Sequence, residues 1–134
     1  MDHSKLQDAY NAYTALRRVS FHNQSYRDRT YGQLVYNKFG MTRVGISEEA
    51  SKETHVPNLT DDHYNNCQSV GHYLATTERD LTIEEFTQIV VEAGKTIRVT
   101  KKENRLLVKH QKDKPYGQGL DAYREAGILY TLSS

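Results

Sequence analysis

The sequence predicts a single α+β domain over residues 1–134, mostly helical, with a small C-terminal antiparallel β-hairpin or sheet. Apolar residues recur at helical spacing in a helical part that covers about residues 4–94. A hairpin, a short helix and a closing strand are expected over about residues 95–132. A chain of 134 residues can bury one core, and its single cysteine excludes an internal disulfide framework.

The first predicted helix is the amphipathic segment "SKLQDAYNAYTALRR". Leu6, Tyr10 and Tyr13 recur at helical spacing, which predicts one apolar face. Ser4 is placed to cap the N-terminus, and two arginines at the other end suit the negative end of the helix dipole.

The stretch after this helix is less regular. "SFHNQSYRDRT" is typical of a loop, and "YGQLVYNKFG" predicts a short helix that ends at Gly40. Two alternatives remain open within residues 43–60, where "TRVGI" fits either a strand or a turn of helix. "SEEASKE" fits an exposed helix.

Two further helices are predicted before residue 95. "TDDHYNNCQSVGHYLATTE" favours a helix from Thr60 or Asp61, with acidic residues in the first turn. "LTIEEFTQIVVEAGK" is the strongest helical pattern in the chain. Thr82 and Glu85 form a capping box, and Gly94 is expected to end the helix.

The C-terminal part is predicted to begin with a hairpin. Residues 96–100 and 105–110 are rich in β-branched and apolar side chains and flank the polar turn "KKEN". "LDAYREAG" predicts a short helix that ends at Gly127, and "ILYTL" predicts a closing strand.

The only cysteine lies between two histidines in "HYNNCQSVGH", residues 63–72. With His55, these residues could supply four zinc ligands, but the spacing matches no zinc finger, knuckle or ribbon. On one continuous helix His63 and Cys67 share a face with Leu74, while His72 lies nearly opposite. We interpret the stretch as a buried helix face, and we expect no metal, no cofactor and no catalytic residue.

Charge is segregated along the chain. Residues 46–94 hold two basic and ten acidic residues, whereas residues 95–114 hold eight basic and two acidic residues. Residues 1–45 carry a net charge of +4. The pattern indicates either that the blocks neutralise each other in the fold, or that a basic surface faces an anionic partner.

The segment "GQLVYNKFGMTRVGIS", residues 32–47, resembles the helix-turn-helix of phage repressors. Gly40, Met41 and Ile46 fill the turn and apolar positions of that motif. The resemblance implies that Arg43 points toward bases. A tyrosine stands where a small residue is usual, and two glutamates fall on the recognition helix, so the motif is degenerate.

The predicted hairpin resembles the wing of winged-helix proteins, whose basic tip lies along the DNA backbone. The helix that precedes it is acidic and would therefore serve poorly as a recognition helix. A Lys-rich hairpin also protects an edge strand from aggregation, so the basic residues have a structural alternative. The candidate nucleic-acid-binding residues are Arg98, Lys101, Lys102, Arg105, Lys109 and Arg43.

These observations predict a non-enzymatic, cytoplasmic binding protein that contacts nucleic acid or a nucleic-acid-handling complex. No apolar run is long enough for a membrane span. The alternative is a protein-directed inhibitor or adaptor, such as an anti-defence protein of a phage or mobile element, that binds no nucleic acid. The sequence leaves the oligomeric state open.

Overall fold

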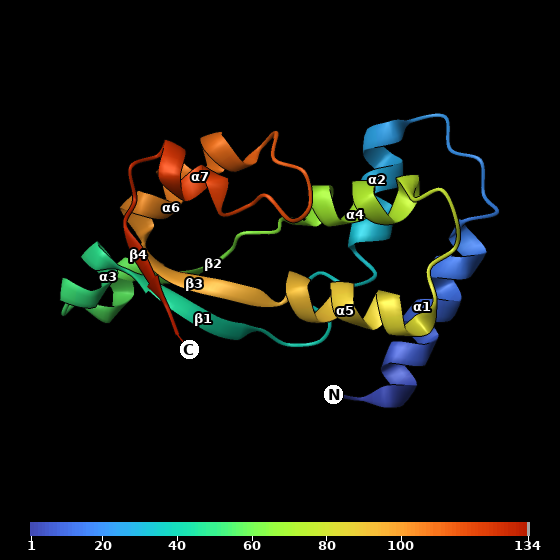
Figure 1. Ribbon diagram of the computed structural model, residues 1–134, viewed down its shortest axis with the longest axis horizontal. Helices are drawn as coiled ribbons and strands as arrows, with labels where there is room; N and C mark the ends of the chain where they lie inside the picture. The colour runs from blue at the N-terminus through green and yellow to red at the C-terminus, as the bar shows by residue number, and fades with distance from the viewer. Residues whose placement is uncertain (134) are drawn as a thin grey trace.

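The chain folds into two groups of elements that lie end to end in Figure 1, a helical group and a group built on a β-sheet. The computed structural model describes residues 1–133. No helix within that range combines the length and apolar character needed to cross a membrane. In chain order the elements are α1 (His3–Leu16), α2 (Gln24–Gly32), β1 (Thr42–Ser47), α3 (Glu48–Lys52), the 3-10 turn η1 (Val56–Asn58), β2 (Leu59–His63), α4 (Cys67–Thr76), α5 (Ile83–Ala93), β3 (Lys95–Thr100), α6 (Lys101–Gln111), α7 (Asp121–Glu125) and β4 (Tyr130–Leu132).

The sheet is mixed and has the strand order β2-β3-β1-β4. The two central strands, β1 and β3, run parallel, while β2 and β4 each pair antiparallel with their neighbour. Its strands come from all along the chain. The α+β class is therefore confirmed, but the expected division into a helical part followed by a C-terminal hairpin is wrong.

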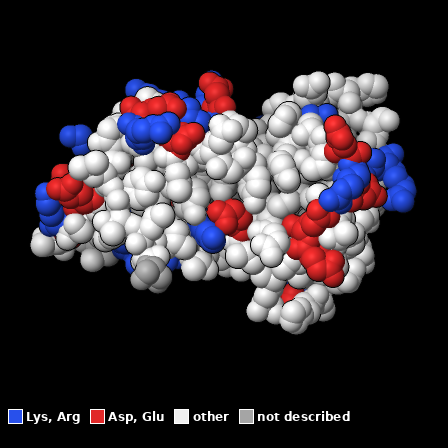
Figure 2. Space-filling model, in the orientation of Figure 1, with Lys and Arg blue, Asp and Glu red and all other residues white. Residues whose placement is uncertain are grey.

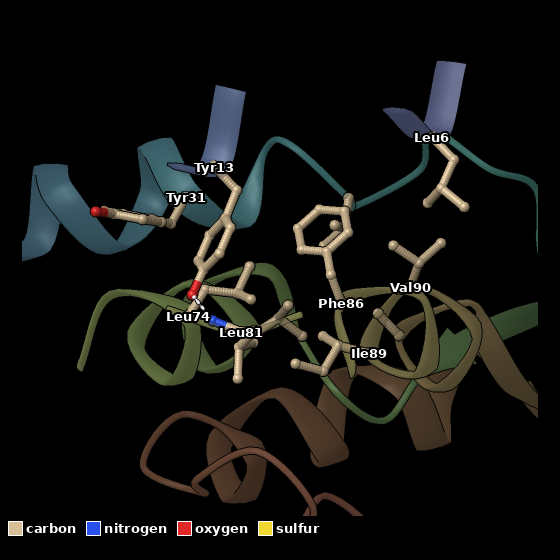
Figure 3. Close-up of a cluster of buried hydrophobic side chains, with 11 residues drawn as sticks. Leu6, Tyr13, Tyr31, Leu74, Leu81, Phe86, Ile89 and Val90 are labelled. Carbon is tan, nitrogen blue, oxygen red and sulfur yellow. Dashed lines mark hydrogen bonds between the residues drawn. The ribbon is translucent and has the colours of Figure 1, made fainter. Parts of the chain in front are cut away.

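The helical group packs around Tyr13 of α1, which is fully buried (Figure 3). Its ring lies 5.4 Å from that of Phe86 on α5, and its hydroxyl accepts a hydrogen bond from the Leu81 amide at 2.9 Å. Tyr31 of α2 and Leu74 of α4 close the same cluster. Aromatic pairs at this spacing add to the free energy gained by burial, so Tyr13 joins all four helices.

The sheet group has a second core on one face of the sheet. Ile97 and Val99 are two residues apart on β3, so both side chains point to this face. They are fully buried with Leu107 of α6 and Tyr123 of α7. Figure 1 shows α6 and α7 together on this side of the strands. The core therefore fixes which side of α6 faces solvent.

Several predicted elements are confirmed. α1, α5, α7, β3 and β4 lie where the sequence patterns place them, and Thr82 and Glu85 form the predicted capping box of α5. The predicted cap of α1 is wrong by two residues. Asp2, rather than Ser4, accepts hydrogen bonds from the first free amides of the helix.

The segment that resembles a helix-turn-helix has a different structure. α2 begins within the predicted loop, because the side chain of Asn23 accepts from the Tyr26 amide and caps it. α2 ends at Gly32, and Thr42–Ser47 is the central strand β1 rather than a recognition helix. The helix-turn-helix interpretation is therefore wrong, and Arg43 lies on a strand.

The predicted basic hairpin is also wrong, because its second half is the helix α6. Thr100 and Glu103 form a capping box that turns the chain from β3 directly into the helix. The side chain of Ser47 on β1 donates to Glu103 at 2.6 Å and fixes the start of α6 to the sheet.

The helix predicted from residue 60 begins later than expected. Residues Leu59–His63 form the edge strand β2, and α4 starts at Cys67 with Asn66 as its cap. The projection of His63 and Cys67 onto one helix is therefore wrong.

Backbones of α2 and α4 touch at two glycines. A Cβ on Gly71 of α4 would overlap the carbonyl oxygen of Asp28, and a Cβ on Gly32 of α2 would overlap that of Cys67. Only glycine allows the two helices to approach this closely.

We predict that Gly71→Ala destabilises the protein by roughly 1–3 kcal/mol or more, because the added methyl must separate α2 from α4. Helix propensity alone predicts the opposite sign, a gain of about 1 kcal/mol. Urea unfolding measures the difference, with Gln88→Ala on the exposed side of α5 as the control. A stabilised Gly71→Ala variant would contradict the close approach of the two helices.

Candidate functional site

The basic residues of α6 share one exposed face of that helix. At about 100° per residue, Lys101, Lys102, Arg105, Lys109 and the helical C-cap residue Lys112 fall within an arc of about 100°. All five side chains are exposed, while Leu107 on the opposite side is fully buried. We call these five residues the basic face of α6. Four of the six candidate residues from the sequence belong to it.

No side chain of the basic face forms an ion pair with another residue in the range 1–133. Neighbouring basic residues do. Lys114 lies 2.7 Å from Glu125, and Lys95 lies 2.8 Å from Glu92. Figure 2 shows Lys and Arg atoms next to Asp and Glu atoms over the end that carries α6 and α7. The five side chains of the basic face thus lack, within residues 1–133, the close acidic partner that Lys95 and Lys114 have.

The other two candidate residues, Arg43 and Arg98, lie on the sheet. The guanidinium of Arg43 binds both carboxylate oxygens of Asp61 on β2, at 3.0 and 3.3 Å. Arg98 is the register partner of Asp61, and its side chain alternates to the sheet face opposite Ile97 and Val99. These two arginines therefore do not extend the basic face.

A buried carboxylate holds α6 and α7 against β2. Asp62 Oδ2 accepts a hydrogen bond from the Tyr123 hydroxyl at 2.5 Å and one from the Gln111 side-chain amide at 2.7 Å. Burial raises the pKa of Asp62, and the two hydrogen bonds and nearby His63 only partly oppose this. The position of the basic face thus depends on a polar contact inside the protein.

The two residues before α4 extend this contact. Asn65 is buried, and its side-chain oxygen accepts from the Gly117 amide at 3.0 Å. The Asn66 side chain donates to the Gln111 carbonyl at 3.3 Å while also capping α4. The sequence patterns did not predict this role. The asparagine pair could have indicated it, because asparagine is strongly preferred at the N-cap of a helix and has a low propensity for the helix interior.

A cleft of about 740 Å³ lies beside the basic face, between the two groups of elements. Its walls come from α2, β2, the start of α4 and α6, and Lys112 belongs both to the cleft and to the basic face. Tyr36 and His63 also line it, with ring centroids 5.1 Å apart. The cleft is thus a polar and aromatic hollow next to unpaired positive charge.

The stretch 63–72 lines this cleft but brings no metal site together. Cys67 faces the cleft, whereas the His72 ring lies 2.9 Å from Asp28 outside it. Burial raises the pKa of the Cys67 thiol and lowers that of His63, so both are neutral near pH 7. Within residues 1–133, no three His, Cys, Asp or Glu side chains gather in a way that could hold a metal ion.

Comparisons of this chain with protein-family models, with curated proteins and with solved structures find no match. A functional interpretation therefore depends on the surface features of the chain itself. Two such features adjoin each other, the basic face of α6 and the cleft between the two groups of elements.

We predict that the free energy of unfolding of Asp62→Asn increases relative to that of wild type as pH rises above about 3.8. Because the folded pKa is raised, the folded chain holds a proton that the unfolded chain releases. The contribution of Asp62 to stability is therefore full below pH 3.8 and is lost as pH rises through its folded pKa. The asparagine oxygen still accepts from Tyr123 or Gln111 but does not titrate.

Urea unfolding of both proteins at several pH values measures this difference. Asp62→Ala is the companion variant. It leaves the Tyr123 hydroxyl and the Gln111 amide buried without a partner and is expected to cost about 1–3 kcal/mol below pH 3.8. This cost also shrinks as pH rises, because alanine does not titrate either. A difference between Asp62→Asn and wild type that stays constant with pH would rule out the raised pKa.

Proposed function

We propose that this protein binds nucleic acid through the basic face of α6 and catalyses no reaction. The observation that carries the proposal is five exposed Lys and Arg side chains on one helix face with no ion pair in the range 1–133. Unpaired surface cations attract polyanions at long range and release counterions when they bind.

The dimensions of the basic face match a nucleic-acid backbone. α6 has 11 residues and is therefore about 16 Å long. One strand of B-DNA carries about five phosphates over this rise. Contacts of this kind position the protein on the backbone without reading bases. We place the protein in the cytoplasm, a compartment that holds nucleic acid and keeps a single thiol such as Cys67 reduced.

A second candidate is an inhibitor or adaptor that binds an acidic protein surface. Leu106 and Val108 flank the basic face and are 41% and 59% exposed. Apolar side chains beside charged ones are typical of protein interfaces, in which a dry centre is surrounded by a polar rim. This candidate predicts capture of a protein and no affinity for nucleic acid.

We predict that the double substitution Arg105→Glu/Lys109→Glu weakens nucleic-acid binding by roughly tenfold or more at about 50 mM salt. It is expected to lower the slope of log affinity against log salt by about 2, one unit for each phosphate that the variant no longer neutralises. Fluorescence anisotropy with labelled DNA and RNA measures both quantities.

The matched control is Lys38→Glu/Arg124→Glu, which makes the same change in net charge at exposed positions outside α6. This control is expected to lower affinity far less than the α6 variant. Equal losses in the two variants would point to non-specific attraction by net charge. No binding by wild type at low salt would remove the proposal and leave the protein-directed candidate.

A further inference from the structure

The cleft beside α6 differs from the basic face in the sign and arrangement of its charges. Lys112 and Arg29 lie among its lining residues, and neither forms an ion pair within residues 1–133. Asp62 lines the same cleft. A small free anion gains little here, because the carboxylates of Asp61 and Asp62 line the same cleft as the cations. A ligand that carries a phosphate at one end and hydrogen-bond donors at the other can bind the cations with its phosphate and the carboxylates with its donors.

The carboxylate of Asp62 has an acceptor to spare. Both of its hydrogen bonds, from Tyr123 and Gln111, go to Oδ2, and no donor within residues 1–133 reaches Oδ1. Carboxylates accept from exocyclic amino groups of bases, such as N4 of cytosine. Asp62 is 5% exposed and lines the cleft, so a base that enters the cleft meets a carboxylate of this kind.

The cleft also offers an aromatic surface. Tyr36 follows α2 and lies over His63 with the rings tilted by 56°. Burial lowers the pKa of His63, so this ring pair carries no charge that would compete for the phosphate. Stacking of bases on aromatic side chains is the main sequence-tolerant interaction with single strands. A volume of about 740 Å³ exceeds what one nucleotide needs.

The two features are continuous on α6. Asn104 and Val108 line the cleft and lie within about 60° of Lys101 around the helix, next to the basic face. A strand whose phosphates follow the basic face thus passes the mouth of the cleft. A duplex cannot place a base there without breaking a base pair and its stacking, which costs a few kcal/mol.

We infer that the cleft binds one unstacked nucleotide of a single strand, with its base against Tyr36 and its amino edge toward Asp62. The inference rests on the proposed function, since the phosphates of the same strand lie on the basic face of α6. The protein is then a single-strand binder. Base selection falls on amino-bearing bases, for which oligo-dC is the probe and oligo-dT the comparison.

The test is anisotropy with labelled oligo-dC, oligo-dT and the dC·dG duplex, on wild type, Tyr36→Leu and Tyr36→Phe. Leucine keeps an apolar side chain against His63 but has no ring, while phenylalanine keeps the ring. We expect wild type to bind oligo-dC more tightly than oligo-dT or duplex. Tyr36→Leu is expected to lose about 5- to 150-fold in affinity for oligo-dC, with duplex affinity unchanged. Tyr36→Phe is expected to match wild type.

The outcomes separate this inference from the proposed function. Unchanged oligo-dC binding by Tyr36→Leu, or an equal loss for duplex and single strand, overturns the cleft as a nucleotide site and leaves the basic face in place. Equal wild-type affinity for oligo-dC and oligo-dT overturns the role of Asp62. No binding of any probe at low salt overturns both proposals. Thermal unfolding of Tyr36→Leu, with unchanged duplex binding, confirms that the variant is folded.

Discussion

The buried carboxylate of Asp62 is the interaction on which the rest of the surface depends. It joins three elements, because the Tyr123 hydroxyl of α7 and the Gln111 amide of α6 both donate to one oxygen on β2. An ionised group in this position costs desolvation free energy, and hydrogen bonds from neutral donors offset only part of it. Apolar packing alone would allow α6 to slide or rotate, whereas the directed bond from Gln111 fixes its register and so the direction of its basic face.

The cleft follows from the way the two groups of elements are joined. α5 continues through Gly94 into β3, so a helix with one buried face and a central strand link the two cores in a single run of chain. On the other side, the crossing from β2 to α4 is polar, and the side chains of Asn65 and Asn66 bind backbone groups rather than making apolar contact. The two cores are thus connected by apolar packing at α5 and β3 and by hydrogen bonds between β2 and α4. The cleft lies on the hydrogen-bonded side, where that side meets solvent.

The sequence signals that succeeded were local. The capping box at Thr82 correctly predicted α5, and an equivalent box at Thr100 marks α6. The second was missed because the apolar residues at 106–108 follow a lysine-rich segment and fit a hairpin equally well. The break between β2 and α4 depends on Asp62 and the asparagine pair finding partners more than 40 residues away, which no local pattern contains. Composition therefore located the basic residues of the candidate site but not their arrangement on a helix, and it did not reveal the cleft.

The charge segregation of the sequence has a physical explanation in the fold. Acidic residues of the segment 46–94 form ion pairs across the structure, as Asp61 does with Arg43 and Asp80 with Arg17. Two arginines of the first basic block thus neutralise two acidic residues of this segment within the fold. The second basic block has no such counterpart for the outer side of α6, since the residues through which this helix packs on the rest of the protein, Leu107 and Gln111 among them, lie on its inner side. Of the two explanations that the sequence left open, internal neutralisation therefore accounts for Arg17 and Arg43, while the exposed basic side chains of α6 form no ion pair within residues 1–133.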